Sequence, residues 1–232
     1  MRFGKIAYLN LLPFDSFIKS YPLPSQVKTF ITLKKSYPAK LNNDFFFKRI
    51  DAGFISSIAG MKSHYKKCVA PSGIIAKGAV WSVIVKHGEG FDYQSSTSNA
   101  LSQVLDLQGE VLIGDRALAY KKSGGEYIDM GEVWWERERL PFVFGRLCFS
   151  KHKELLLRIS KAYNAKTRSK RKKIPRYQLL NAQNTSGIES AYILEYLEHI
   201  FYEIGAKERA GLERFYRFVR LKRLFLKRSF RI

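Results

Sequence analysis

Short apolar runs alternate with stretches of helical periodicity over the first 150 residues of the chain. Brief runs rich in β-branched and aromatic residues predict buried strands, and apolar residues three or four positions apart predict helices. We expect strands at residues 5–9, 27–33, 52–55, 78–85, 111–113, 127–130 and 142–148. We expect helices at residues 11–21, 38–48 and 98–107. Strands that alternate with helices predict an α/β fold with mostly parallel sheets.

The pattern becomes wholly helical after residue 150. Helices are expected at residues 153–165, 176–184, 188–202 and 206–230, and the last of them is basic and amphipathic. A run of Lys and Arg at residues 168–173 separates the first two of these helices, and we expect it to be a disordered loop.

The charge of the chain departs most from that of an ordinary globular protein. Lys and Arg number 41 against 20 Asp and Glu, which gives a formal net charge of +21. Residues 151–232 carry 21 of the basic side chains against 7 Glu and no Asp. Such charge attracts nucleic acids and anionic membranes, but no nucleic-acid motif accompanies it. We therefore interpret it as a solvated surface whose field attracts anionic substrates, and we do not expect nucleic-acid binding as the main activity.

Composition and motifs exclude several classes of protein. No apolar run approaches the ~20 residues needed to span a bilayer, so we expect no membrane insertion. The two cysteines, Cys68 and Cys148, are too few for a disulfide framework and lack zinc-finger spacing. No secretory signal is visible at the N-terminus, so the cytoplasm is the expected compartment. Glycine-rich, nucleophile and metal-ligand motifs are also missing, and we expect neither a cofactor nor a metal.

Four polar clusters stand where a predicted strand ends or a helix begins, the usual position of ligands in open α/β sheets. They are Asn10, the pair Ser56 and Ser57, Ser82, and the run Ser95, Ser96, Thr97 and Ser98. Hydroxyls, amides and free N–H groups at a helix N-terminus hold carboxylates or phosphates. Each cluster alone also suits a helix cap. Together they predict a cleft lined with neutral donors.

Ionisable side chains also bear on the site. Asp115 follows the predicted strand 111–113 and is either a charged site residue or the cap of a helix over residues 116–122. The four histidines stand in Lys-rich or helical surroundings, so we expect surface residues rather than catalysts; they are His64, His87, His152 and His199.

Seven segments carry a resemblance to a known family: GKIAYLNLLP at residues 4–13, DAGFISS at 51–57, GAVWSV at 78–83, SSTS at 95–98, VLIGDRAL at 111–118, DMG at 129–131 with Trp135, and LPFVF at 140–144. In this order they resemble the chorismate dehydratase family of the futalosine route to menaquinone. The resemblance runs from Gly4 to about Phe215, and seven segments in register are specific where one would not be. The family usually has Thr-Gly before the last segment, where this chain has Glu138 and Arg139.

The resemblance implies the two-lobed α/β fold of type II periplasmic binding proteins, with a central ligand cleft. Residues 1–83 and 144–232 would form one discontinuous lobe with the C-terminal helices, and residues 84–143 the other. Crossovers near Ser82 and Phe142 would form the hinge, and closure of the cleft would exclude water.

The implied activity is that of a lyase that removes water from chorismate and gives 3-[(1-carboxyvinyl)oxy]benzoate. None of the four clusters contains a strong base, so we expect the enolpyruvyl carboxylate of the substrate to take the proton. Asn10 and Ser82 would position that arm and the leaving hydroxyl. The expected substrate-binding residues are Ser56, Ser57, Ser95, Ser96, Thr97, Ser98 and Asp115.

Two other functions fit the same fold. The dihydroxynaphthoate synthase of the same pathway uses a histidine in the second half of its chain, but no histidine here stands in a matching motif. A non-catalytic anion-binding protein is disfavoured because export and lipidation signals are missing. Whether the protein forms a homodimer is left open by the sequence.

Overall fold

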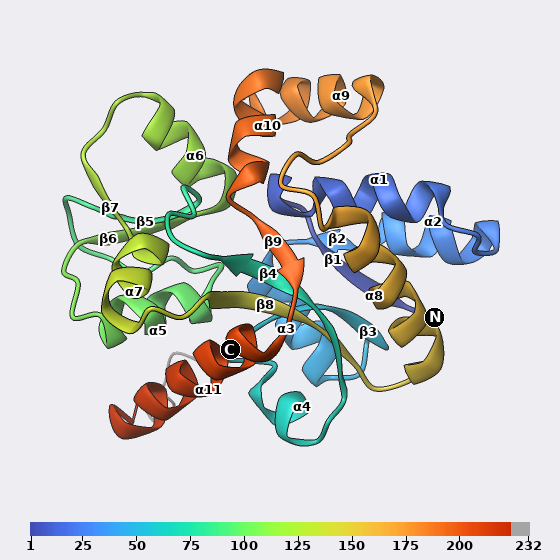
Figure 1. The fold of residues 1–232 in the computed structure, drawn as a ribbon, viewed down its shortest axis with the longest axis horizontal. Coiled ribbons are helices and arrows are strands. Elements are labelled where there is room, and N and C mark those ends of the chain that lie inside the picture. Colours follow the sequence, from blue (N-terminus) through green and yellow to red (C-terminus); the bar gives the residue numbers. More distant parts are fainter. Residues whose placement is uncertain (224–232) are drawn as a thin grey trace.

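The computed structural model describes residues 1–223 and shows a mixed α/β protein with two β-sheets (Figure 1). The larger sheet has the order β2-β1-β3-β8-β4-β9. Its strands are β1 (Phe3–Ile6), β2 (Lys35–Ser36), β3 (Ala52–Ser56), β4 (Val69–Ala76), β8 (Phe142–Phe149) and β9 (Phe201–Glu203). The smaller sheet has the order β6-β5-β7, with β5 (Val83–Lys86), β6 (Glu110–Ile113) and β7 (Tyr127–Asp129). Each sheet with its helices forms one lobe.

The expectation of mostly parallel sheets is wrong. Within the described residues, β1 pairs in parallel with β2 and with β3. All other pairs are antiparallel, including β8 with both β3 and β4. The physical reason is that β8 returns from the smaller sheet through the middle of the larger one and runs against both of its neighbours. Alternation of strands and helices predicts the elements but not their direction.

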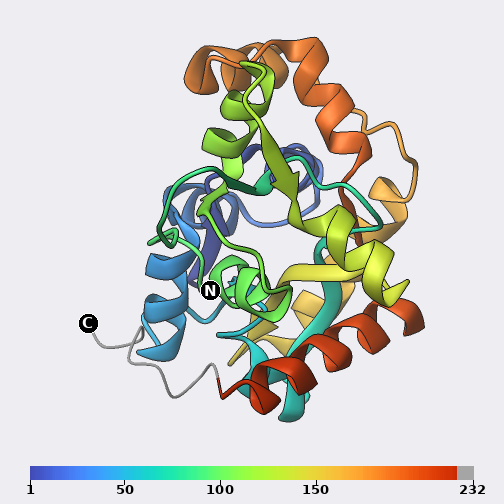
Figure 2. The ribbon, with the colours of Figure 1, turned by 90° about the vertical axis from the view of Figure 1, so that its left-hand side faces the viewer.

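Helices surround both sheets. Those around the larger sheet are α1 (Leu12–Ser20), α2 (Ser25–Leu33), α3 (Pro38–Phe46), α4 (Met61–Tyr65), α8 (Lys153–Thr167) and α11 (Ala206–Leu221), with a 3-10 turn η1 (Leu9–Leu11) after β1. Those of the smaller sheet are α5 (Ser96–Val104), α6 (Gly114–Lys122) and α7 (Met130–Glu138). The helices α9 (Arg176–Ser186) and α10 (Ser190–Glu198) lie together at the top of the molecule in Figure 2.

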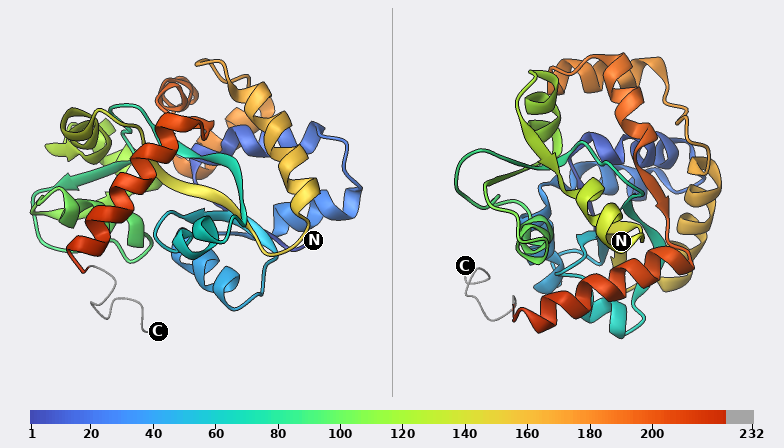
Figure 3. Two further views of the ribbon diagram at one scale, coloured as in Figure 1. Left: turned by 60° about the horizontal axis from the view of Figure 1, so that its bottom comes forward. Right: turned by 60° about the vertical axis from the view of Figure 1, so that its left-hand side comes forward.

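Helix α11 connects the two lobes. It packs against β8 of the larger sheet and against α5 of the smaller lobe, and Figure 3 shows it running across both. Its Phe215 meets Trp134 of α7 with ring centroids 6.1 Å apart, and both rings are fully buried. The expected helix over residues 206–230 is therefore present to Leu221, and its last part lies outside the described residues. No helix within residues 1–223 has the length and apolarity that a membrane crossing requires.

Other segments also differ from the sequence-based expectation. The sequence predicts a strand at residues 27–33, but these residues belong to α2. There Thr29 and Thr32 donate their hydroxyls to backbone carbonyls four residues earlier. Residues 78–82 form a loop before β5 rather than the start of a strand. The expected helix over residues 188–202 ends at Glu198, and its last residues enter β9.

Candidate active site

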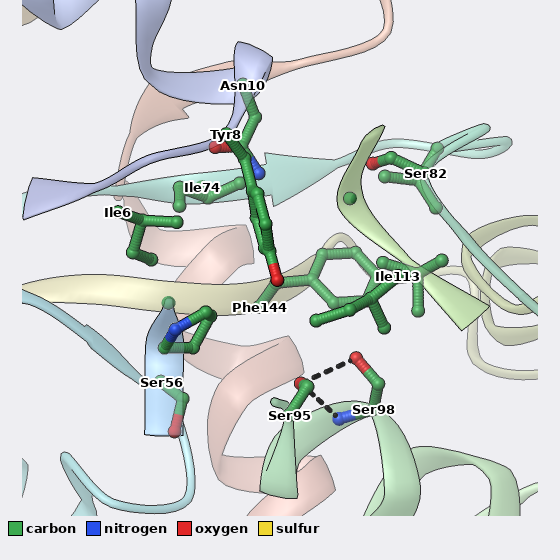
Figure 4. Close-up of a pocket in the computed structure, with 15 residues that line it drawn as sticks. Ile6, Tyr8, Asn10, Ser56, Ile74, Ser82, Ser95, Ser98, Ile113 and Phe144 are labelled. Atoms are coloured by element: carbon green, nitrogen blue, oxygen red, sulfur yellow. Dashed lines mark hydrogen bonds between the residues drawn. The ribbon is translucent and has the colours of Figure 1, made fainter. Parts of the chain in front are cut away.

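A cavity lies between the two lobes (Figure 4). Its empty space is about 470 Å³, counted out to the solvent at its mouth. The apolar part of its wall includes Ile6, Ile74, Ile113 and Phe144. The polar part consists of Tyr8, Asn10, Ser56, Ser82, Ser95 and Ser98. Within the described residues, no Asp, Glu, His, Lys or Arg lines this cavity.

The four predicted clusters meet at this cavity. Figure 4 shows Tyr8 crossing its middle, with Asn10 above, Ser82 to one side, and Ser95 and Ser98 below. Of the nine predicted site residues, five line the wall: Asn10, Ser56, Ser82, Ser95 and Ser98. The other four do not line it: Ser57, Ser96, Thr97 and Asp115.

Asn10 sits in η1, the 3-10 turn that joins β1 to α1. It is 9% exposed, and its backbone oxygen accepts a hydrogen bond from the Tyr202 hydroxyl at 2.6 Å. The side-chain oxygen of Asn10 has no hydrogen-bond partner among the described residues. A buried polar atom without a partner is costly in a folded protein. Because Asn10 lies in the wall, this oxygen can accept from a ligand hydroxyl, and the NH₂ group of the same amide can donate to a ligand carboxylate.

Ser82 is held by a tyrosine that sequence reasoning missed. The Tyr196 hydroxyl, on α10, donates to Ser82 Oγ at 2.9 Å, and both residues are buried. A serine hydroxyl donates one hydrogen and accepts up to two. Since Tyr196 is the donor here, the hydrogen of Ser82 remains available for a ligand. Tyr196 and Ser82 are 114 positions apart, so no local pattern indicates the pair.

The loop that carries Ser82 is fixed by one carboxylate. Trp81 has a left-handed backbone (φ 65°), which is uncommon for a bulky residue. Asp129 is 5% exposed and accepts hydrogen bonds of 2.7–3.1 Å from the backbone N–H groups of Val80, Trp81, Gly131 and Glu132. The same side chain therefore caps α7 and clamps the loop before β5.

Ser56 and Ser57 follow one another but have different surroundings. Asn42 of α3 donates to Ser56 Oγ at 2.8 Å and accepts from the Ser56 backbone N–H at 3.1 Å. Asn42 was not singled out by the sequence. Ser57 donates its hydroxyl to the Val143 carbonyl, and its N–H donates to the Phe144 carbonyl at 3.0 Å. The Ser57 hydroxyl is therefore committed to β8.

The serine-rich run caps α5. Ser95 Oγ accepts from the Ser98 backbone N–H at 3.1 Å, and the two hydroxyls lie 2.9 Å apart. Thr97 is 1% exposed, and its hydroxyl oxygen accepts from the Ile58 N–H at 3.1 Å. Ser96 is half-buried. The run thus serves as a helix cap and also borders the cavity.

Asp115 and Tyr8 tie the β1–η1 turn to the smaller lobe. Asp115 accepts from the Leu9 N–H at 3.1 Å, and burial raises the pKa of its carboxyl to about 6. Tyr8 donates its hydroxyl to the side-chain oxygen of Gln94. Its ring lies so close to Gly114 that a Cβ there would be 2.9 Å from it. Burial also raises the pKa of Tyr8, so this hydroxyl stays protonated.

The histidines lie away from the cavity wall. His87 and His152 are exposed, as expected, whereas His64 and His199 are half-buried. The ring of His199 lies 4.2 Å from that of Trp81, beside the loop that carries Ser82. Within residues 1–223, no cluster of three or more His, Cys, Asp or Glu is arranged to hold a metal ion.

Comparison with known proteins relates this geometry to a family. Residues 91–220 match the family described as menaquinone biosynthesis. A chorismate dehydratase of Campylobacter jejuni subsp. jejuni serotype O:23/36 (strain 81-176) is 42% identical over 219 residues, which cover 93% of this chain and 96% of that protein.

Solved structures agree on the fold. Protein AF1704 of Archaeoglobus fulgidus has a TM-score of 0.62 at 14% identity and covers 96% of this chain, with 98% of its own chain covered. The periplasmic aliphatic sulphonate binding protein SsuA of Escherichia coli has a TM-score of 0.55 at 15% identity, with 98% and 94% covered. The chain therefore has the two-lobed fold of periplasmic binding proteins, and it belongs to the menaquinone-biosynthesis family, with a chorismate dehydratase among its relatives.

Proposed function

We propose that the protein is a chorismate dehydratase, a lyase that removes water from chorismate to give 3-[(1-carboxyvinyl)oxy]benzoate. The relative that is 42% identical across nearly the whole chain supports this reaction. The observation that carries it on the structural side is a cavity with four sets of neutral hydrogen-bonding groups and no charged side chain among the described residues.

The reaction depends more on precise positioning of the substrate than on a strongly acidic or basic side chain. Chorismate loses a ring proton and the neighbouring ring hydroxyl, and its ring becomes aromatic. The products are therefore strongly favoured, and only the barrier must be lowered. An enzyme lowers it by holding both carboxylates in place, by directing the proton to a base and by stabilising the departing hydroxide.

The wall of the cavity offers no base for the proton. Its only titratable side chain among the described residues is Tyr8, whose pKa is raised by burial. A neutral amide such as that of Asn10 is a very poor base. We therefore propose that the enolpyruvyl carboxylate of the substrate takes the ring proton. Removal of water on closure would make this carboxylate more basic.

Each part of the wall then has a role in the proposal. Asn10 orients the enolpyruvyl arm, and Ser82 donates its free hydrogen to the leaving hydroxyl. Ser56, Ser95 and Ser98 bind the ring carboxylate beside the N-terminus of α5, where unpaired N–H groups attract an anion. For Ser57, Ser96, Thr97 and Asp115 we propose an indirect role, since they do not line the wall.

The proposal includes closure of the two lobes. We propose residues 1–83 with 144–232 as one lobe and residues 84–143 as the other, with the hinge near Ser82 and Phe142. In support, the larger sheet takes no strand from between β4 and β8, and the smaller sheet lies wholly within that interval. A cytoplasmic location and the absence of nucleic-acid binding stay predictions, and whether the protein forms a homodimer stays open.

One assay tests the main proposal. Purified protein is incubated with chorismate, and formation of the enolpyruvyl benzoate is followed by its aromatic absorbance and by mass. We expect turnover without any added cofactor. Folded protein that leaves chorismate unchanged would overturn the proposal.

A second assay tests the source of the base. In Asn10→Asp a carboxylate stands where the native wall has an amide. We expect its rate to show a new titrating group that the native enzyme lacks. A native pH profile that already requires a side-chain carboxylate would contradict substrate-assisted proton removal.

A further inference from the structure

A second hollow shares Tyr8 with the cavity described above. It is bounded by β1, α1 and β2 on one side and by α9 on the other. Its free space is about 1300 Å³, counted out to the solvent at its wide mouth. None of the proposed catalytic residues lines it, so the dehydration does not account for its chemistry.

One wall of the hollow is rich in lysine. Lys5 is 2% exposed and is paired with Asp15, and the Lys35 ammonium lies 3.6 Å from the same carboxylate. Lys19 lies over the ring of Tyr177, 5.4 Å from its centroid. Asp15 and Asp115 also line the hollow, so its wall carries three Lys against two Asp. An anion is therefore favoured there over a cation.

The facing wall is the polar side of α9. A helix on a protein surface normally turns its apolar side inward, but here Gln178, Asn181 and Thr185 line the hollow while Leu180 is 45% exposed. Gln178 is 5% exposed and donates to the Tyr177 hydroxyl at 3.0 Å. Its side-chain oxygen has no hydrogen-bond partner among the described residues. Such an arrangement is typical of a surface built to meet polar atoms rather than to pack.

We propose that this hollow is a second binding site, specific for a small aromatic carboxylate. The carboxylate would lie between Lys19 and Lys35. The ring would stack on the face of Tyr177 that Lys19 does not cover, and Tyr177 is 62% exposed at the rim. This chemical class includes the product of the proposed reaction, and only that last identification rests on the proposed function. Tyr8 lines both this hollow and the first cavity.

The direct test uses 4-bromobenzoate as the probe. Crystals of the full chain are soaked with it, and anomalous scattering locates the bromine. We expect one bromine within the hollow, beside Tyr177, whether or not another occupies the first cavity. A bromine found only in the first cavity, or only on exposed lysines elsewhere, would overturn the proposal.

Solution binding tests the same site without a crystal. The double variant Lys19→Gln/Lys35→Gln should weaken the second binding event for 4-bromobenzoate by about tenfold, the scale of two partly exposed ion pairs. Asn181→Leu, which fills the hollow from the polar side of α9, should also weaken it. The matched control is Lys161→Gln, on an exposed lysine of α8 outside the hollow, and it should bind as the native protein does.

Equal affinity in the double variant and in the Lys161→Gln control would mean binding at crystal concentration only, and the proposal would fall. None of these measurements involves chorismate. A protein that binds the probe in the hollow but does not dehydrate chorismate would keep this site and lose the proposed function. A protein that turns over chorismate but leaves the hollow empty would keep the proposed function and lose this second site.

Discussion

The role of a serine hydroxyl depends on whether its hydrogen and its lone pairs already have hydrogen-bond partners. The oxygen of Ser82 accepts from the Tyr196 hydroxyl, so the hydrogen of Ser82 is free to be donated to a ligand. The hydroxyl of Ser57 already donates its hydrogen to the Val143 carbonyl. Two serines that look equivalent in the sequence thus have different uses. The difference comes from partners distant in the chain.

Removing the two proposed catalytic groups should affect the rate and not the fold. We expect Asn10→Ala and Ser82→Ala each to lower turnover by about 100-fold or more, because one positioned donor in a dry site contributes roughly 3 kcal/mol to the barrier. Tyr196→Phe should lower turnover less, by about tenfold, because Ser82 is kept but loses the hydrogen bond that orients its hydroxyl. Steady-state rates with chorismate measure the loss of turnover, and circular dichroism of each variant checks that the fold is kept. Near-native rates in both alanine variants would show that the site is elsewhere.

The N-terminal ion pair should make stability depend on pH. Arg2 donates to Asp51 at 2.8 Å and lowers the pKa of that carboxyl from 3.8 to about 2. A carboxyl whose pKa is lower in the fold stabilises it above pH 4, and this contribution is lost as the pH falls through 2. In urea unfolding, Asp51→Asn should therefore be less stable than the native protein at pH 6. The gap should narrow between pH 4 and pH 2, and a gap that stays constant over this range would contradict the assignment.

Much of the cavity wall could be predicted at this scale. Asn10 and Ser56 stand at recognisable ends of strands, and Ser82 is the single hydroxyl in an apolar run. Their supports could not be predicted. Asn42 and Tyr196 are ordinary helix residues in the sequence, and only the folded chain brings them to their serines.

At the scale of elements, the loop between β4 and β5 depends on a side chain from another element. Asp129 ends β7, begins α7 and also holds the N–H groups of residues 80 and 81. The uncommon backbone of Trp81 is stabilised by these bonds, and it places Ser82 in the wall. A change in α7 should therefore reach the site through this loop.

Asp129→Asn tests the clamp. An amide presents one acceptor oxygen and an NH₂ group that cannot accept, so about half of the N–H groups would lose their partner. Buried donors without a partner cost about 1–3 kcal/mol, and we expect a loss of stability of that size in urea unfolding. Turnover should fall as well, because Ser82 is released. The control is Glu132→Gln, at an exposed position on α7, and a clamp variant as stable and active as this control would refute the role of Asp129.

The elements that the sequence missed have local reasons. Strand β4 contains Pro71 and Gly73, which normally argue against a strand, and its pairing with β8 shifts register beside them. Residues 27–33 are rich in β-branched side chains, which favour a strand, but their apolar positions also fit a helix. Packing of α2 on β1 decides between the two. Short segments of this kind are fixed by their neighbours in space.

At the scale of the whole molecule, the basic surface and the cavity are separate. The run 168–173 connects α8 to α9 and is anchored there, because Lys172 donates to the Ser169 carbonyl at 2.6 Å and lies over the rings of Phe201 and Tyr202. None of its residues lines the cavity. Its charge can reach a substrate only through the long-range field.

Apart from Lys172, the run 168–173 has four basic side chains: Arg168, Lys170, Arg171 and Lys173. Replacing these four with serine should lower kcat/KM for chorismate by less than about tenfold, because the substrate would encounter the protein more slowly. The loss should shrink as salt rises, because charges are screened beyond about 8 Å at physiological ionic strength. Exchanging Arg for Lys and Lys for Arg at the same positions keeps the charge and serves as the control. Complete inactivation, or a loss that salt does not reduce, would place this run in the cleft.

The order of strands in the larger sheet has a consequence for how the protein is made. Strand β8 lies between β3 and β4 in the sheet and pairs with both, yet it comes after all three strands of the smaller sheet along the chain. A ribosome therefore releases β3 and β4 long before the strand that seals them, and both carry open, apolar edges in the meantime. The smaller sheet, whose strands are consecutive, can pair during that interval. The nascent chain is thus most exposed to aggregation, and most dependent on chaperones, just before residue 142 emerges.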